Sequence, residues 1–189
     1  MSIIRTSRFV LRPFEKRDAA AFASSVREAA GAADHWLSWA AASYSEEDAR
    51  GWFRSAAIGH KAGTSHEYGI FSLADGEFVG GAGLNRIDPY NRMANLGYWV
   101  RPARRRQGVA RECASALVEY AFTVLDLQRI EIVVALGNDV SAGVARKIGA
   151  QLECVAQNRL RVSGQPVAAY VFALIAEPRE RPSSPFDAR

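Results

Sequence analysis

The chain lacks the features of a membrane, secreted or disulfide-stabilised protein. No apolar run reaches the roughly 18 residues that a membrane-spanning helix needs, and the first residues contain no apolar signal-peptide core. The two cysteines, Cys113 and Cys154, are too few for a disulfide framework. Cys113 lies among apolar residues at helical spacing, which is typical of a small core residue. We therefore expect a cytoplasmic protein with no membrane partner.

Metal ligands and covalent nucleophiles are scarce as well. The histidines His35, His60 and His66 show no metal-ligand spacing, so no metal site is predicted. No cysteine and no Ser-His arrangement suits the formation of a covalent enzyme intermediate. Any group transfer is therefore expected to be direct.

What is present fits one enzyme-sized domain. The chain has 189 residues, of which 49% are hydrophobic and 10% aromatic, enough to bury a core and to exclude wholesale disorder. There is no internal repeat and no sign of a second domain. We expect one domain over residues 1–176. Residues 177–189 are rich in Pro and Ser and are predicted to be a flexible tail.

The charge is basic and comes almost entirely from arginine. The net charge is +4 and the pI is about 9.3. Arginine forks suit phosphate groups, and the densest cluster is Arg101, Arg104, Arg105, Arg106 and Arg111. An anionic cofactor explains this cluster. A nucleic-acid-facing surface is the less favoured alternative.

Apolar periodicity predicts an alternation of strands and helices. Strands are predicted at 8–14, 67–73, 77–87, 93–101, 130–136, 152–162 and 166–175. Helices are predicted from Asp18 to Gly31, Ser45 to Gly63, Ala110 to Val124 and Asn138 to Gly149, with Asp18, Ser45 and Asn138 as N-caps. The buried faces are expected to include Trp52, Phe53, Ala56 and Ala57 in the second helix and Val140, Val144 and Ile148 in the fourth.

The most informative segment joins the strand ending near Val100 to the long third helix. It consists of Arg105, Arg106, Gln107, Gly108, Val109 and Ala110. A glycine-containing turn that begins a helix leaves backbone N–H groups free, and the helix dipole adds about half a positive charge there. The pattern alone indicates a weak anion site, because the residues of a P-loop or of a dinucleotide fingerprint are missing. An ordinary strand–helix turn with solvated arginines explains it almost as well.

This segment resembles the Arg/Gln-x-x-Gly-x-Gly/Ala motif of the GNAT superfamily of acyl-CoA-dependent N-acetyltransferases. The first strand around Leu11, the strand Leu96–Val100 and the segment from Asn138 to Gly149 are similar to the family in order and spacing. The resemblance extends from about Arg8 to Ile175. This combination is similar to the branch that contains the bacterial ribosomal-protein N-terminal acetyltransferases. It implies a single GNAT-type α/β domain, with a mixed, mostly antiparallel sheet of about seven strands flanked by about four helices.

The resemblance also implies which residues bind acetyl-CoA. The loop Arg105, Arg106, Gln107, Gly108, Val109 and Ala110 would cradle the pyrophosphate, and the backbone of Trp99 and Val100 would pair with the pantetheine arm. The residue matching Asn138 contacts the pantetheine, and the residue matching Ser141 lies near the sulfur. Many relatives carry a tyrosine as general acid where this chain has Ala145. Ser141, directly or through a water, is therefore the predicted proton donor.

The general base is not evident. Some relatives carry a carboxylate where this chain has Asn95, so Glu67 and Asp88 remain as weak candidates. A free α-amine with a pKa of about 7.7–8.0 is roughly 10–15% neutral at pH 7, whereas a lysine amine with a pKa of about 10.4 is well below 0.1% neutral. A site without a strong base is therefore expected to favour α-amines or other amines of low pKa.

An aromatic group formed by Trp36, Trp39 and Tyr44 is the candidate acceptor wall, with core packing as an equal alternative. Such a wall suits a peptide N-terminus or a small planar or cationic amine. The leading hypothesis is an acetyl-CoA-dependent N-acetyltransferase that acts on a primary amine of a protein N-terminus or small molecule. The alternative is a GNAT-fold module that binds acyl-CoA for sensing or protein interaction. A nucleic-acid partner is not favoured, and the oligomeric state, a homodimer included, stays open.

Overall fold

Eight strands form one mixed sheet in the part of the chain that the computed structural model describes, residues 2–31 and 36–177. The order across the sheet is β1-β2-β3-β4-β5-β6-β8-β7. The strands are β1 Ile4–Arg5, β2 Phe9–Arg12, β3 His66–Ser72, β4 Phe78–Asp88, β5 Met93–Val100, β6 Arg129–Ala135, β7 Gln151–Val162 and β8 Gln165–Ile175. The helices are α1 Ala19–Gly31, α2 Glu46–Ala62, α3 Val109–Thr123 and α4 Asp139–Lys147, with 3₁₀ turns η1 Lys16–Asp18 and η2 Pro102–Arg104. The predicted fold is confirmed, with one short extra strand, β1.

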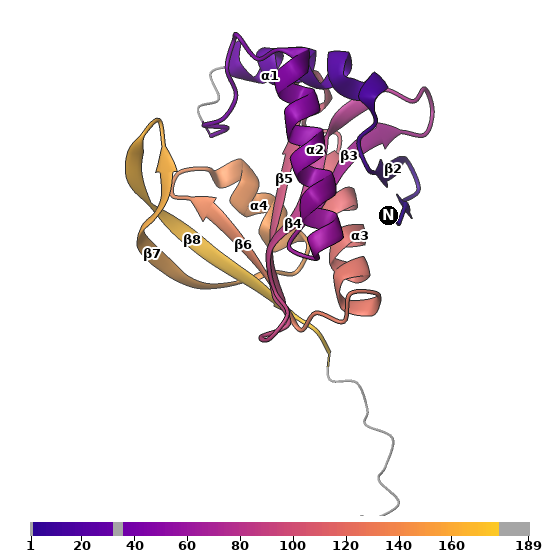
Figure 1. Cartoon of the computed structure of the whole chain (residues 1–189). Coiled ribbons are helices and arrows are strands. Elements are labelled where there is room, and N and C mark those ends of the chain that lie inside the picture. Colours follow the sequence, from indigo (N-terminus) through magenta and orange to yellow (C-terminus); the bar gives the residue numbers. More distant parts are fainter. Residues whose placement is uncertain (1, 32–35, 178–189) are drawn as a thin grey trace, which may run out of the picture.

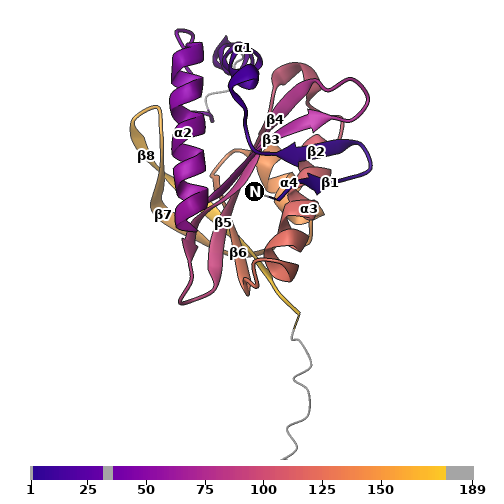
Figure 2. The ribbon, with the colours of Figure 1, turned by 45° about the vertical axis from the view of Figure 1, so that its right-hand side comes forward.

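The helices cover both faces of the sheet (Figure 1). The larger core cluster lies between the sheet and α3, with Leu117 of α3 packed among buried strand residues such as Ile70 and Leu96. The smaller cluster lies under α1 and α2, where Phe22 and Phe53 meet Phe78. In Figure 2, α1 and α2 lie on one side of the strands, and α3 lies on the other. Each face of the central strands is therefore buried.

The sheet opens in its middle, between β5 and β6. These two strands form the single parallel pair among the described strands, and they pair only from Met93, opposite Arg129, to Asn95, opposite Glu131. Beyond that point β6 continues to pair with β8, while β5 continues to pair with β4. The edges of β5 and β6 that face each other therefore lack strand partners over the rest of their length.

Two helix starts form as the sequence predicts. Ser45 accepts a hydrogen bond from the Asp48 N–H and receives the reciprocal contact from the Asp48 carboxylate, which is a capping box. Asn138 caps α4 by accepting from the Ser141 N–H at 3.1 Å. Gly63 ends α2 in the left-handed conformation, with φ of 71°.

Other local predictions were wrong. Asp18 does not cap α1; its carboxylate instead accepts from the Glu15 N–H and pairs with Arg12 at 2.7 Å. On α2, Trp52 and Ala57 are exposed, and the helix buries Ala49, Phe53 and Ala56. On α4, Val140 is 82% exposed, and the buried residues are Ala142 and Ala145, because small side chains let this short helix lie close to its neighbours. Of the predicted tail 177–189, all but Glu177 lies outside the described residues.

Candidate active site

A pocket of about 230 Å³ occupies the opening between β5 and β6. Its walls come from five separate segments of the chain. The lining residues are Trp36, Leu37, Ser38, Leu96, Gly97, Tyr98, Ile132, Val133, Val134, Ala135, Asn138, Ser141, Leu160, Arg161 and Val162. The pocket thus joins the start of α4 to the middle of the sheet and to the β7–β8 hairpin.

The free edge of β5 forms one side of this pocket. Residues of an antiparallel strand direct their N–H and C=O groups alternately toward either neighbour. β5 pairs with β4 from Asn95 to Val100, but its pairing with β6 ends at Asn95. Alternate backbone groups beyond Asn95 therefore face the opening. Trp99 and Val100 lie at its far end. This edge can hold an extended ligand in the way that a sheet accepts an added strand.

The N-terminus of α3 follows β5 directly. The first hydrogen bond of the helix runs from the Glu112 N–H to the Gly108 C=O at 3.0 Å. The N–H groups of Val109, Ala110 and Arg111 therefore precede it and have no acceptor within the helix. The helix dipole makes this end positive. The arrangement suits a phosphate or pyrophosphate.

Gly108 is required by the shape of this loop. It adopts φ of 78°, and a Cβ there would lie 3.2 Å from the Arg8 guanidinium. Arg8 also donates to the Gln107 carbonyl at 2.9 Å and pairs with Glu112 at 2.7 Å. Although partial burial opposes its charge, hydrogen bonds from Thr6, Arg8 and Ser7 lower the pKa of Glu112 to about 2. Arg8, in the turn between β1 and β2, thus ties this loop to the N-terminal part of the sheet.

The arginine cluster divides into two groups with different tasks. Arg101 pairs with Glu28 at 2.9 Å and with Glu77 at 2.6 Å, and Arg104 also pairs with Glu77. These two residues brace the loop against α1 and β4, so the expectation that the whole cluster serves an anion was wrong. Arg106 and Arg111 are exposed on the loop and on the first turn of α3. Their side chains are accessible to an anion near the N-terminus of α3.

Inside the pocket, two hydroxyl groups meet at the first turn of α4. The Tyr98 hydroxyl donates to the Ser141 carbonyl at 3.0 Å, and the Ser141 Oγ donates to the Tyr98 hydroxyl at 3.3 Å. Burial raises the pKa of Tyr98 despite the contact with Ser141, so the phenol is neutral at pH 7. Asn138 holds the same turn through the Ser141 N–H. The pair can donate hydrogen bonds to a negative charge that develops in the pocket.

Tyr98 was not predicted as a donor from the sequence. Alternation along a strand shows that neighbouring residues point to opposite faces, but not which of the two meets a particular helix. The structure packs the Trp99 ring against Phe22 and Phe78, while Tyr98 faces α4. Ala145, the position at which the resemblance implies a tyrosine in many family members, is fully buried. A phenol therefore reaches the first turn of α4 from β5.

Glu67 lies on β3, two strands from the pocket wall. A Cβ on Gly83 would come within 1.9 Å of the Glu67 carboxylate, so this side chain lies directly over the glycine. The same row across the sheet continues to Gly97, which lines the pocket. Burial raises the pKa of Glu67. The carboxylate can therefore accept a proton closer to neutral pH than an exposed glutamate can.

Two asparagines lie beside this row. Asn85 donates to Glu67 at 3.5 Å and accepts from Asn95 at 3.0 Å. They link the carboxylate to β5 at the last paired position before the opening. Asp88, the other weak base candidate, caps the β4–β5 turn by accepting from Tyr90 and Asn91.

The predicted aromatic wall is split. Trp36 lines the pocket and approaches the backbone at Gly137. Trp39 packs edge-on against Trp99, with ring centroids 5.5 Å apart, and Tyr44 packs against Phe22. These two rings extend the core cluster under α1 and α2, although Trp39 keeps 45% of its surface exposed.

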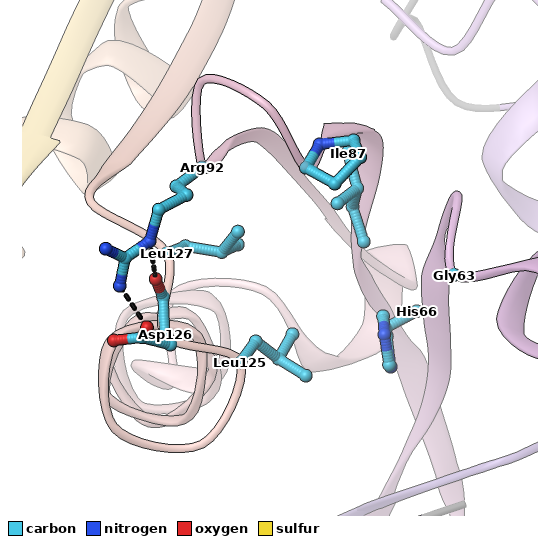
Figure 3. Close-up of a pocket in the computed structure, with 8 residues that line it drawn as sticks. Gly63, His66, Ile87, Arg92, Leu125, Asp126 and Leu127 are labelled. Carbon is cyan, nitrogen blue, oxygen red and sulfur yellow. Dashed lines mark hydrogen bonds and ion pairs between the residues drawn. The ribbon is translucent and has the colours of Figure 1, made fainter.

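A second pocket, of about 350 Å³, lies at the opposite end of α3 (Figure 3). Its charged side chains, Arg92 and Asp126, pair with each other. His66 lies on its wall, and burial, His60 and the N-terminus lower the pKa of His66 to about 4. Among the described residues that line it, Asp126 is the one carboxylate, and it is held in the ion pair with Arg92.

No group of three or more His, Cys, Asp or Glu side chains among the described residues could hold a metal ion. None of the helices in residues 2–31 and 36–177 is long and apolar enough to cross a bilayer.

Comparison with known proteins shows the family to which this chain belongs. Residues 8–151 match the acetyltransferase (GNAT) domain. The chain is 31% identical over 122 residues to the ribosomal-protein-serine acetyltransferase of Escherichia coli K12. This alignment covers 64% of this chain and 67% of that protein. It is 33% identical over 103 residues to YdaF of Bacillus subtilis, named as a ribosomal N-acetyltransferase, which covers 54% of this chain. That alignment spans only 56% of YdaF.

Solved structures agree over nearly the whole chain. An acetyltransferase of Salmonella typhimurium that modifies the N-terminal serine of ribosomal protein L7/L12 is 25% identical, with a TM-score of 0.82, over 93% of this chain and 100% of that one. RimL, a ribosomal L7/L12 α-N-protein acetyltransferase in complex with coenzyme A, shares the fold with a TM-score of 0.85 at 24% identity, over 93% and 98%. The chain therefore belongs to the GNAT acetyltransferase family.

Proposed function

We propose that the protein is an acetyl-CoA-dependent N-acetyltransferase that moves the acetyl group directly to a primary α-amine. One observation carries this proposal. The pocket between β5 and β6 contains the Tyr98–Ser141 pair and lies on the free edge of β5, and β5 leads along the chain to the open N-terminus of α3. An elongated ligand with a reactive thioester at one end and a pyrophosphate at the other matches this sequence of features.

The residues present fit acetyl-CoA. The N–H groups at Gly108, Val109 and Ala110, with the exposed Arg106 and Arg111, would hold the pyrophosphate. Gln107 and Arg105 shape the same loop; Arg105 Nε donates to the Val100 carbonyl at 3.2 Å. The edge of β5 up to Trp99 and Val100 would pair with the pantetheine arm, and Asn138 lies where that arm ends.

Acetyl-CoA, when bound, supplies the acetyl group as a thioester, so that transfer forms a C–N bond, breaks the C–S bond and leaves a thiolate and a surplus amine proton. Ser141 and Tyr98 act on the thiolate side. A phenol with a pKa above 10 does not fully protonate a thiolate whose conjugate acid has a pKa of about 8.5. The two hydroxyl groups therefore stabilise the developing charge by hydrogen bonding, and the proton finally arrives from solvent.

On the amine side, Glu67 is the candidate base. Its row across Gly83 and Gly97 carries no side chains, so water can link the carboxylate to an amine in the pocket. A base that acts through water suits an α-amine, because its pKa of about 7.7–8.0 lies roughly 2.5 units below that of lysine. This preference agrees with one solved structure described as a ribosomal L7/L12 α-N-protein acetyltransferase and another described as modifying the N-terminal serine of L7/L12.

A second candidate function is an acyl-CoA-binding module with little catalysis. It is favoured by one observation: no carboxylate is among the described residues that line the pocket. The two functions differ in turnover. Release of CoA should be measured with α-amino peptides, lysine peptides, polyamines and aminoglycosides as acceptors. The proposal expects turnover with α-amino peptides above all others. Acetyl-CoA binding without turnover on any acceptor would favour the binding module.

A further inference from the structure

The charge of the pocket is set by one side chain. Among its described lining residues, Arg161 alone carries a charge, and the polar groups of Ser38, Tyr98, Asn138 and Ser141 are neutral. Glu67, the candidate base, lies two strands away from the pocket wall of β5. An acceptor that enters here therefore meets a single positive charge.

Arg161 is unpaired, unlike the other arginines of this region. Arg129 pairs with Glu131 at 2.8 Å and also with Glu153, and Arg159 approaches Glu131 at 4.0 Å. The Arg161 side chain has neither an ion-pair nor a hydrogen-bond partner among the described residues. An arginine fork without a carboxylate partner keeps all its donors available for an anion.

The shape of the hairpin brings Arg161 to the pocket. The pairing of β7 with β8 shifts between Ala156 and Leu160, and Asn158 in this bulge has φ of 52°. A bulge of this kind bends a strand and redirects its side chains. Beyond the bulge, Leu160, Arg161 and Val162 all line the pocket. Trp36, from the segment before α2, lines the same pocket.

We propose that Arg161 selects acceptors that carry an anionic group close to the reacting amine. This inference rests on the proposed N-acetyltransferase function and names its substrate class: an α-amine with a carboxylate on the same molecule. That carboxylate is the acidic side chain of the second residue in a protein N-terminus or the carboxylate of a free amino acid. Polyamines are disfavoured, because their remaining ammonium groups would meet Arg161 without a compensating carboxylate on the lining.

The test compares peptides that differ only in the second residue, which is Glu, Ala or Lys. An ion pair with an exposed arginine such as Arg161 is worth about 2- to 5-fold in an equilibrium constant. The wild-type kcat/KM should therefore be about 2- to 5-fold higher for the Glu peptide than for the Ala peptide, and lower again for the Lys peptide. Free glutamate and alanine, tested alongside, show whether a peptide is needed. Raising the salt concentration should weaken the preference.

Charge reversal provides the sharper comparison. Arg161→Glu should invert the order of the Glu and Lys peptides and leave the Kd for acetyl-CoA unchanged. Arg5→Glu is the matched control, because Arg5 is an exposed arginine on β1 at the opposite edge of the sheet. It makes the same change in net charge and should keep the wild-type order.

A binding measurement separates this inference from the proposed function. Calorimetry with the N-acetylated Glu and Lys peptides, in the presence of CoA, should give the same order and the same inversion in Arg161→Glu. Absence of transfer to any acceptor would overturn the proposed function, while the binding order would still decide the role of Arg161. Equal kcat/KM for all three peptides, or an effect of Arg161→Glu on acetyl-CoA binding instead of on the acceptor, would overturn the assignment of Arg161.

Discussion

Removal of the Tyr98 hydroxyl is the most informative single change to the proposed chemistry. Tyr98→Phe deletes a hydrogen bond of 3.0 Å to the Ser141 carbonyl and the acceptor of the 3.3 Å contact from Ser141 Oγ. A neutral hydrogen bond contributes about 0.5–1.5 kcal/mol. The loss of stability should therefore be about 1 kcal/mol, which lowers the Tm by about 2–4 °C in a chain of this size.

The effect on turnover should be larger than the effect on stability. Removal of a group that assists a leaving group lowers kcat by about 10- to 1,000-fold. A thiolate with a conjugate-acid pKa of about 8.5 leaves tolerably well unaided, so we expect the lower end of that range for Tyr98→Phe and for Ser141→Ala. Because the two hydroxyl groups contact each other, they should act as a unit. The double variant should then lose little more than the worse single variant.

The assay is kcat from CoA release at saturating acceptor, with the Kd for acetyl-CoA from calorimetry as the check on binding. Tyr120→Phe is the matched control, since the Tyr120 hydroxyl donates to Ser2 at 3.1 Å and lies outside the pocket. Its kcat should stay at the wild-type value. Wild-type kcat in both Tyr98→Phe and Ser141→Ala would refute the reasoning and leave water as the sole donor.

Three further changes test other parts of the account. Gly108→Glu should weaken acetyl-CoA binding at least 10-fold in calorimetry, because it places a carboxylate at the positive end of α3. The left-handed backbone at this position, with φ of 78°, should cost the variant about 1–3 kcal/mol of stability. An equal loss of acetyl-CoA affinity in Gly108→Ala would show that backbone strain alone is responsible. Glu67→Gln should remove the rise of kcat that accompanies ionisation of Glu67, whose pKa is raised. The folded protein becomes less stable as pH rises through a raised carboxylate pKa, so this variant should be as stable as the wild type at pH 7 or more stable. An unchanged pH profile of kcat would exclude Glu67 as the base. His66 has a pKa of about 4 in the folded chain and about 6.5 when unfolded, so stability should fall by about 1–2 kcal/mol, after solvent screening, as the pH drops from 6.5 to 4; a His66→Gln variant with the same acid dependence in urea unfolding would contradict this.

The sequence predicted the order of elements well because each element carries a strong local signal. The capping box at Ser45, the cap at Asn138 and the glycine at Gly108 all act within one or two turns of chain. Strand positions followed from alternation, which the buried residues of β6 reproduce. What local signals cannot report is the opening between β5 and β6, since it depends on where two strands distant in sequence cease to pair.

The site was less predictable for the same reason. The arginines near the loop look alike in sequence, yet Arg101 forms an ion pair with Glu28 and Arg104 forms one with Glu77, both from distant segments. Tyr98 meets Ser141 across 43 positions of sequence. The unpaired Arg161 was not singled out either, because a single arginine in a strand gives no sign of whether a carboxylate lies within reach.

The central claim is that the surface from the α3 N-terminus to the Tyr98–Ser141 pair binds acetyl-CoA. Calorimetric titration of the protein with acetyl-CoA tests it most directly, with free acetate and AMP as controls for the acyl group and for a simple phosphate. We predict one site per chain with a Kd in the range of about 1 to 50 μM, equivalent to roughly 6–8 kcal/mol of binding free energy. No detectable heat at tens of micromolar acetyl-CoA, or binding that Gly108→Glu leaves unchanged, would contradict the account.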